Sequence, residues 1–188
     1  MGNILLAETR YDGRHLTGTD VERSVKTLKD IRSIFSDSEA GRKLPDEQVI
    51  YEVESYLPVP SGTLGGLFFG ITFIHPGRVG DEYFMTRGHF HQIQDRAEYY
   101  WCIAGEGALL LMDQQRNTWT EKMYPGSLHY IPAGVAHRTA NTGSGVLSFG
   151  ACWPADAGYD YERIDREGFS KILVRKEGIP TLIDRPTR

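Results

Sequence analysis

The stretch RGHFHQIQDRAEYYWCIAGEG (residues 87–107) decides how this chain is expected to fold. It places His89 and His91 two positions apart in strand-like surroundings, and Glu98 follows seven positions after the second histidine. Side chains at i and i+2 of a strand leave the same face, with Cα atoms roughly 6.5–7 Å apart. Because metal–nitrogen bonds are about 2 Å long, both imidazoles can reach one ion without backbone strain. The alternative is an ordinary half-buried pair of strands.

The second half of this stretch predicts another strand, AEYYWCIAGEG, in which Glu98, Tyr100 and Cys102 share one face. Antiparallel pairing of the two strands would bring Glu98 beside the histidines. Glu98 is therefore the third candidate ligand.

A fourth candidate lies in YPGSLHYIPAGVAHRTANTG (residues 124–143). The turn formed by Pro132 and Gly134 can aim His137 inward. Three imidazoles and one carboxylate suit Fe, Mn, Zn, Ni or Co better than Mg or Ca. The remaining histidines are not expected to be ligands; they are His15, His75 and His129.

The chain beyond residue 48 shows a period of two, in short aromatic and β-branched segments separated by turn signals. Such spacing predicts an all-β sandwich or closed barrel, here over residues 48–175 or so. The predicted strands are VIYEVESYL, GLFFGITFI, EYFMTRGHFH, AEYYWCIAGEGALLLMD, GSLHYIPAG, HRTANTG and GVLSFGACW. The tail RIDREGFSKILVRKEGIPTLID predicts one more hairpin.

An N-terminal extension, residues 1–47, is predicted to carry the one helix, over residues 20–35 or so. Thr19 and Glu22 fit a capping box at its start. The apolar residues at helical spacing are Val21, Val25, Leu28 and Phe35.

The length of 188 residues suits a single domain, 1–188. A net charge of −4 argues against nucleic acid or an anionic membrane as a partner. No apolar run reaches the ~18 residues of a membrane span, and the N-terminus lacks the features of a signal peptide. We therefore expect a soluble, cytoplasmic protein in which Cys102 and Cys152 stay reduced.

The two histidine-bearing stretches resemble the two motifs of the cupin superfamily. The second motif, G-x5-P-x-G-x2-H-x3-N, is matched at every position from Gly126 to Asn141, and the first ends at Gly105. Two features differ: six residues separate His91 from Glu98, and Tyr83 stands where a leading glycine is usual. The resemblance implies a cupin double-stranded β-helix, or jelly-roll barrel, with the N-terminal helix and strand extensions added.

From about residue 15 to the C-terminus the chain is similar to the cupin-type glucose-6-phosphate isomerases first known from archaea. The likeness rests on TRGHFHQIQDRAEYYWCIAGEG, IPAGVAHRTANTG and WPADAGYDYERIDREGFSKILV. It implies a homodimeric cytoplasmic enzyme of glycolysis and gluconeogenesis, with one divalent metal ion per subunit, Fe²⁺ first among the candidates, and a sugar phosphate as its substrate. The implied metal ligands are His89, His91, Glu98 and His137.

The same resemblance implies a phosphate end of the pocket. The candidate contacts are Thr72, Thr86, the backbone of Gly88, and Tyr161. Trp153 and Tyr159 stand where the family usually has Tyr and His. Three arginines that border the motifs are left out of the predicted site; they are Arg87, Arg96 and Arg138.

Aldose–ketose isomerisation moves hydrogen between C2 and C1, and a divalent ion chelating both oxygens would stabilise the enediolate charge. Glu98 is the expected acid/base unless the hydrogen passes directly as hydride, and Tyr100 is a second candidate that could orient Glu98 or bond the sugar. The alternatives are an isomerase for another aldose phosphate such as mannose 6-phosphate, a non-haem iron cupin dioxygenase, and a non-catalytic sugar-phosphate sensor.

Overall fold

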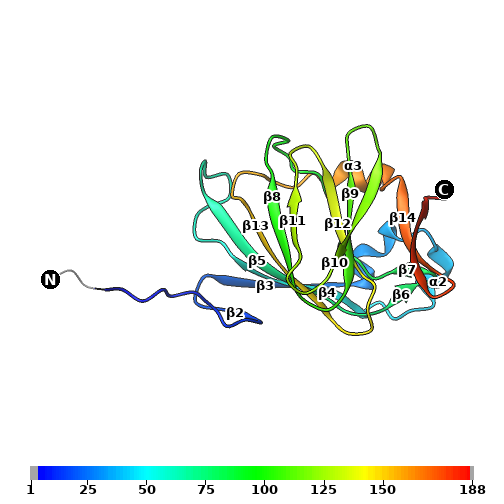
Figure 1. Cartoon of the computed structure of the whole chain (residues 1–188), viewed down its shortest axis with the longest axis horizontal. Coiled ribbons are helices and arrows are strands. Elements are labelled where there is room, and N and C mark those ends of the chain that lie inside the picture. Colours follow the sequence, from blue (N-terminus) through cyan, green and yellow to red (C-terminus); the bar gives the residue numbers. More distant parts are fainter. Residues whose placement is uncertain (1–3, 187–188) are drawn as a thin grey trace.

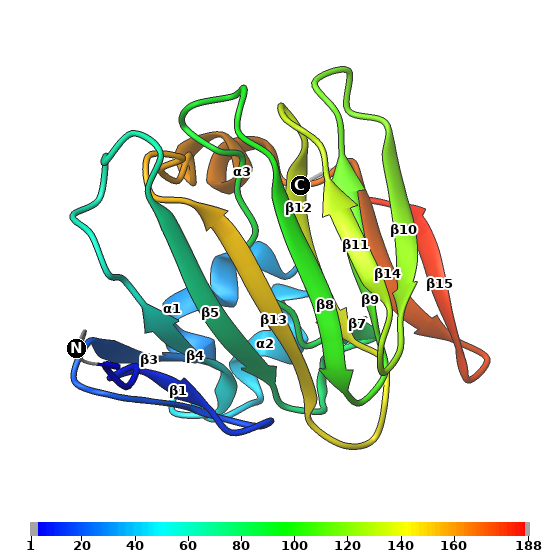
Figure 2. The same cartoon turned by 60° about the vertical axis from the view of Figure 1, so that its left-hand side comes forward.

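Antiparallel pairing of short strands builds the barrel-shaped body of the molecule, which the computed structural model describes over residues 4–186 (Figure 1). A six-stranded sheet runs in the order β11-β8-β13-β5-β4-β3, and Figure 2 shows its strands side by side. Its strands are β3 Val21–Thr27, β4 Val49–Tyr56, β5 Leu67–Ile74, β8 Glu98–Ala104, β11 Leu128–Ile131 and β13 Leu147–Pro154.

A three-stranded sheet, β10-β9-β12, forms another wall of the barrel. Its strands are β9 Gly107–Met112, β10 Thr118–Met123 and β12 Ala136–Asn141. All of β9 and β12 is buried, as expected for a strand covered on both faces. Leu109 and Leu111 of β9 join the main core cluster with Ile74 of β5 and Phe149 of β13.

The remaining strands form two smaller sheets. One has the order β15-β14-β7-β6, and the other is the hairpin β1-β2 near the N-terminus. Their bounds are β1 Arg10–Tyr11, β2 Leu16–Thr17, β6 Arg78–Val79, β7 Glu82–Tyr83, β14 Lys171–Lys176 and β15 Ile179–Asp184. The short helices are α1 Leu28–Ile31, η1 Arg32–Ile34, α2 Ser38–Arg42 and α3 Glu162–Glu167.

The all-β prediction is confirmed, and most predicted strands are present. The tail hairpin is formed by β14 and β15, although α3 occupies the start of that segment. Cys102 and Cys152 are free thiols.

The helix predicted over residues 20–35 is wrong for its first half. Residues Val21–Thr27 are the edge strand β3, paired with β4, and Val25 is 49% exposed instead of packed. Helical structure begins after Thr27, whose side chain and backbone form a capping box with Asp30. A run containing two valines, Ser24 and Thr27 has weak helix propensity, and pairing with β4 prevails.

The predicted strand EYFMTRGHFH is not continuous. β7 ends at Tyr83, and isolated bridges then pair Met85 with Ala140, His89 with His137, and Phe90 with Asp160. Gly88 has φ +77°, a left-handed conformation that interrupts regular strand geometry. His89 and His91 therefore lie on an extended segment held by isolated pairs.

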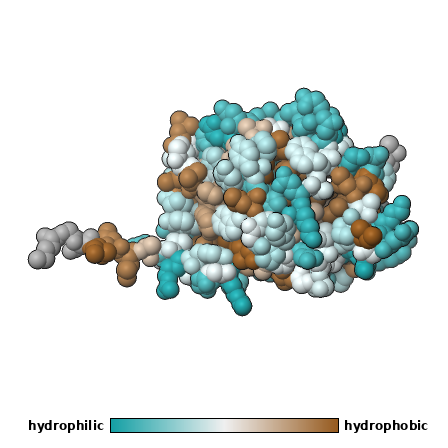
Figure 3. All heavy atoms as spheres, viewed as in Figure 1, coloured by the Kyte–Doolittle hydropathy of each residue, from teal (hydrophilic) through white to brown (hydrophobic). Residues whose placement is uncertain are grey.

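Residues 4–6 extend away from the body of the molecule, and Figure 3 shows them as an apolar projection. The side chains of Ile4, Leu5 and Leu6 are among the most exposed in the chain. Exposed apolar groups of this kind are typical of contact surfaces, and the homodimer stays a prediction. No helix within residues 4–186 is long and apolar enough to cross a membrane.

Gly150 of β13 lies opposite Trp101 of β8, and a Cβ built at this position would come within 2.1 Å of the indole. We predict that Gly150→Ala lowers the free energy of unfolding by about 1–3 kcal/mol, since the packed ring must shift. Urea denaturation measures the change. Gly145→Ala is the matched control, because nothing lies within 4 Å of a Cβ there; equal effects of the two substitutions would contradict the packing argument.

Candidate active site

Four side chains converge on one point inside the barrel. They form what we call the His/Glu cluster: His89, His91, Glu98 and His137. One ligating atom from each lies within 4.8 Å of all the others. The structure thus brings together the four residues predicted as metal ligands, from two stretches that are far apart in the sequence.

The backbone positions three of these side chains, those of His89, His137 and Glu98. The amide of His89 donates to the carbonyl of His137 at 3.3 Å, and the amide of His137 donates back to His89 at 3.1 Å. Residues that exchange both bonds lie opposite each other and project their side chains to the same side. Glu98 is the first residue of β8, on the neighbouring sheet.

Two of the imidazoles are oriented by main-chain carbonyls. His91 Nδ1 lies 2.9 Å from the carbonyl oxygen of Arg96, and His137 Nδ1 lies 3.3 Å from that of Val135. A carbonyl only accepts, so each Nδ1 carries a proton, and each Nε2 faces the cluster. Outer contacts of this kind orient metal ligands in proteins.

The long loop between His91 and Glu98 is anchored at Arg96. Its guanidinium forms two-pronged contacts with Asp156, at 2.9 and 2.7 Å, from the PAD block of the sequence. Asp156 thereby fixes the peptide whose carbonyl orients His91. The six residues between His91 and Glu98 therefore help to orient His91. They do so through Arg96, which was not predicted to belong to the site.

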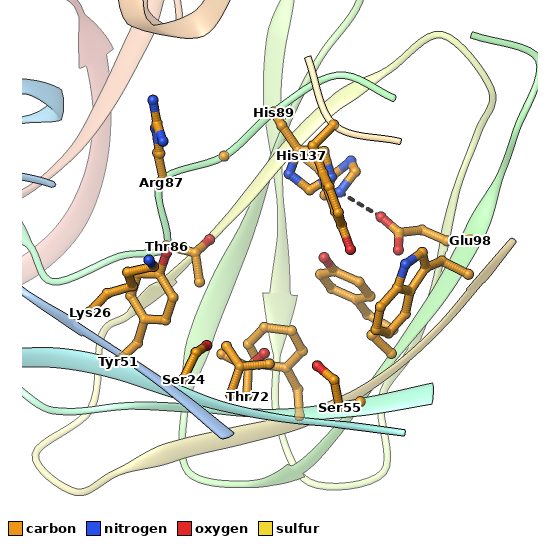
Figure 4. A pocket seen from close by; sticks show the side chains of 18 of the residues that line it. Ser24, Lys26, Tyr51, Ser55, Thr72, Thr86, Arg87, His89, Glu98 and His137 are labelled. Atoms are coloured by element: carbon orange, nitrogen blue, oxygen red, sulfur yellow. Dashed lines mark ion pairs between the residues drawn. The ribbon is translucent and has the colours of Figure 1, made fainter. Parts of the chain in front are cut away.

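The buried charges within the cluster suit a cation. Burial opposes ionisation of Glu98, yet His137 and His91 hold the pKa of its carboxyl below the usual range. Burial, with His137 nearby, holds the pKa of His89 well below its usual value, so His89 is neutral. Glu98 Oε1 lies 2.5 Å from His137 Nε2, the pair marked by the dashed line in Figure 4.

Apart from the close ionic contacts among themselves, the inward-facing atoms of the cluster are buried without a hydrogen-bond partner among residues 4–186. These are the three Nε2 atoms and Glu98 Oε1. Buried polar atoms that lack partners are costly, and a divalent ion would satisfy all of them at once. The donor set therefore fits one ion of the kind that binds nitrogen and oxygen together.

A cavity of about 260 Å³ opens beside the cluster. Among residues 4–186 that line it, Glu98 is the only carboxylate, whereas Lys26 and Arg87 supply positive charge. Figure 4 shows Glu98, His89 and His137 at one end and Arg87, Lys26 and Thr86 at the other. We call these the metal end and the cationic end.

All the predicted substrate contacts line this cavity; they are Thr72, Thr86, Gly88 and Tyr161. The hydroxyl oxygen of Thr86 accepts a bond from the amide of Thr139 at 3.0 Å, so its proton remains free to donate into the cavity. The guanidinium carbon of Arg87 lies 4.4 Å from the centroid of the Tyr161 ring.

Several lining residues were not predicted. Ser24 and Lys26 come from β3, which the helix prediction concealed; as i and i+2 of a strand they share one face. Arg87 also lines the cavity and pairs with Asp165, whose Oδ1 lies 3.2 Å from Nε. A strand predicted over residues 21–27 would have placed Ser24 and Lys26 on one face and so indicated them as possible cavity residues.

Two tyrosines border the metal end. Tyr100 packs perpendicular to His137, and burial together with Glu98 holds the pKa of its phenol well above the usual value. Tyr159 lies 4.8 Å from His89 between ring centroids, and burial raises its pKa to about 12. Both phenols are protonated at neutral pH and can donate hydrogen bonds.

Proteins with similar sequences include several glucose-6-phosphate isomerases. Residues 25–181 match the family model described as glucose-6-phosphate isomerase (GPI). A glucose-6-phosphate isomerase of Thermococcus litoralis is 41% identical over 169 residues, covering 89% of this chain and 88% of that protein. One of Pyrococcus horikoshii is 40% identical over 167 residues, covering 88% and 87%.

Among solved structures, a deletion mutant of Bacillus subtilis oxalate decarboxylase is similar to 61% of this chain and 28% of that chain. The TM-score is 0.46 and the identity 19%, so this likeness carries no argument about function.

We predict that the chelator-treated protein binds one Mn²⁺ or Zn²⁺ per chain, and that His137→Ala weakens this affinity more than about 100-fold. Loss of outer contacts alone typically costs 10–100-fold, and a direct ligand should cost more. Titration against a chromophoric chelator measures both affinities. His75→Ala is the control, since the His75 imidazole bonds Glu52 and is not part of the His/Glu cluster; equal metal affinity in all three proteins would contradict the assignment.

Proposed function

This chain belongs to the glucose-6-phosphate isomerase family, and on that premise we propose that it interconverts glucose 6-phosphate and fructose 6-phosphate with one divalent ion held by the His/Glu cluster. The observation that carries the proposal is the two-ended cavity. One end presents four metal-ligating atoms, and the other presents cations and hydroxyls suited to a phosphate.

The cationic end would bind the phosphate group. Lys26 offers an ammonium at the cavity wall, and the Thr86 proton is free to donate toward an anion. Thr72 lines the same cavity from β5. Arginine, lysine and hydroxyl donors are the groups with which proteins hold phosphate.

The metal end would carry the chemistry. When bound, a divalent ion such as Fe²⁺ would polarise the C1 and C2 oxygens and stabilise negative charge on the sugar. Glu98 would move the proton between C2 and C1, because its carboxylate is ionised and lines the cavity. Tyr100 keeps its proton and would donate a hydrogen bond to the sugar or to Glu98.

Water is restricted at this end by aromatic walls. Phe149 lies tilted against Tyr100 with 4.8 Å between ring centroids, and Tyr159 packs edge-on against His89. A poorly hydrated site strengthens the electrostatic contacts that stabilise a developing charge.

We predict that chelator-treated protein is inactive and that reloading with Fe²⁺, Mn²⁺, Zn²⁺, Ni²⁺ or Co²⁺, tested separately, restores conversion of fructose 6-phosphate to glucose 6-phosphate. A coupled assay follows the product. Mannose 6-phosphate in the same assay reports the substrate range, and an oxygen electrode tests for a dioxygenase. Absence of isomerisation with every metal would end the proposal.

We predict that Glu98→Gln lowers kcat at least about 100-fold, the typical contribution of a positioned acid/base. Metal content is measured on the same sample, so that loss of the ion is separated from loss of the base. Glu106→Gln is the control, because its side chain is exposed on the loop after β8. The wild-type reaction in D₂O should place solvent deuterium on the product; complete retention of the substrate hydrogen would point to direct hydride transfer.

A further inference from the structure

We infer that Arg138 is a positioning residue for the cationic end of the cavity. It holds the Arg87–Gly88 peptide so that the Gly88 N–H faces a phosphate monoester, while Arg138 itself touches no ligand. This inference rests on the proposed function only in naming the ligand as a sugar phosphate.

Arg138 is almost completely buried, which is unusual for an arginine. Its exposed fraction is 2%, and the guanidinium carbon lies 4.4 Å above the ring of Phe169. Its Nη2 donates to the carbonyl oxygen of Arg87 at 2.5 Å, and Nη1 lies 3.5 Å from the sulfur of Met85. Its Nε has no partner among residues 4–186.

The hydrogen bond to Arg87 dictates where the next amide points. All peptide bonds described are trans, and in a trans peptide the C=O and N–H groups point in opposite directions. Because the Arg87 carbonyl faces Arg138, the Gly88 N–H faces away from it. Gly88 lines the cavity, and its amide has no protein acceptor among residues 4–186.

Glycine at position 88 is required by the same contact. A Cβ there would come within 2.9 Å of both Cβ and Nε of Arg138, and φ is +77°. A side chain at 88 would therefore push the peptide away from the guanidinium. Arg138 and Gly88 act as one unit that fixes a single backbone donor.

The charge on Arg138 is not neutralised by direct pairing. No carboxylate lies within ion-pair distance of Arg138 among the residues described. Burying a cation is energetically costly. Here the buried cation lies beside the Arg87–Gly88 peptide, whose N–H end attracts anions.

The test measures binding of inorganic phosphate to the Zn²⁺-loaded protein by calorimetry, together with KM and kcat for fructose 6-phosphate. We expect Arg138→Met to weaken phosphate binding and raise KM about tenfold or more, with unchanged zinc content and a smaller change in kcat. Arg138→Lys, which keeps the charge, should recover part of the loss. Arg163→Met is the matched control, because Arg163 lies at the same 4.4 Å over Phe90 but outside the cavity.

A second measurement needs no substitution. Titrating the Zn²⁺-loaded wild type with phosphate should shift the Gly88 amide in its ¹H–¹⁵N spectrum, and an unmoved Gly88 signal at saturation would overturn the inference. A folded, zinc-loaded Arg138→Met protein with wild-type phosphate affinity would also overturn it. Absence of turnover in a wild type that still binds phosphate through Gly88 would refute the isomerase proposal alone.

Discussion

The two backbone hydrogen bonds between His89 and His137 are the contact on which both ends of the cavity depend. They join an extended segment at residues 85–90 to β12, and this pairing closes the wall of the barrel. Strand geometry then sets His91 two positions along on the same side. Without this pair, the imidazoles would have no common centre for Glu98 to approach.

The residues that flank this pair extend its influence to the cationic end. Gly88 precedes His89 and Arg138 follows His137, and the two meet behind the cavity wall. Thr86 and Thr139 are bonded one step further along the same two segments. One local pairing therefore aims imidazoles at a common centre and, in the function proposed here, would set an amide toward the phosphate at the opposite end of the cavity.

The sequence was sufficient for the cluster because its residue spacings carry the geometry. His89 and His91 share a face by parity, and the turn at Pro132 and Gly134 aims His137 inward. The sequence was not sufficient for β3, because valines spaced four apart in residues 21–25 fit a helix as well as an exposed edge strand. Pairing with β4 settles the choice, and that pairing is a tertiary fact.

Arg138 illustrates a second limit. The alternation of side chains along a strand correctly predicts that Arg138 points away from the side of His137, and so away from the ion site. The same alternation does not predict that Arg138 contacts the Arg87–Gly88 peptide. The role of Arg96 was hidden for a similar reason, since its backbone carbonyl, not its side chain, meets His91. Contacts through the main chain leave no residue-type signal in a sequence.

We propose that His89, His91, Glu98 and His137 together hold a single ion. Anomalous diffraction from crystals of the Mn²⁺-loaded protein tests it most directly. We predict one strong peak per chain at about 2.0–2.3 Å from three Nε2 atoms and one Glu98 oxygen. A peak bound by other residues, or no peak at this position in a fully loaded crystal, would contradict it.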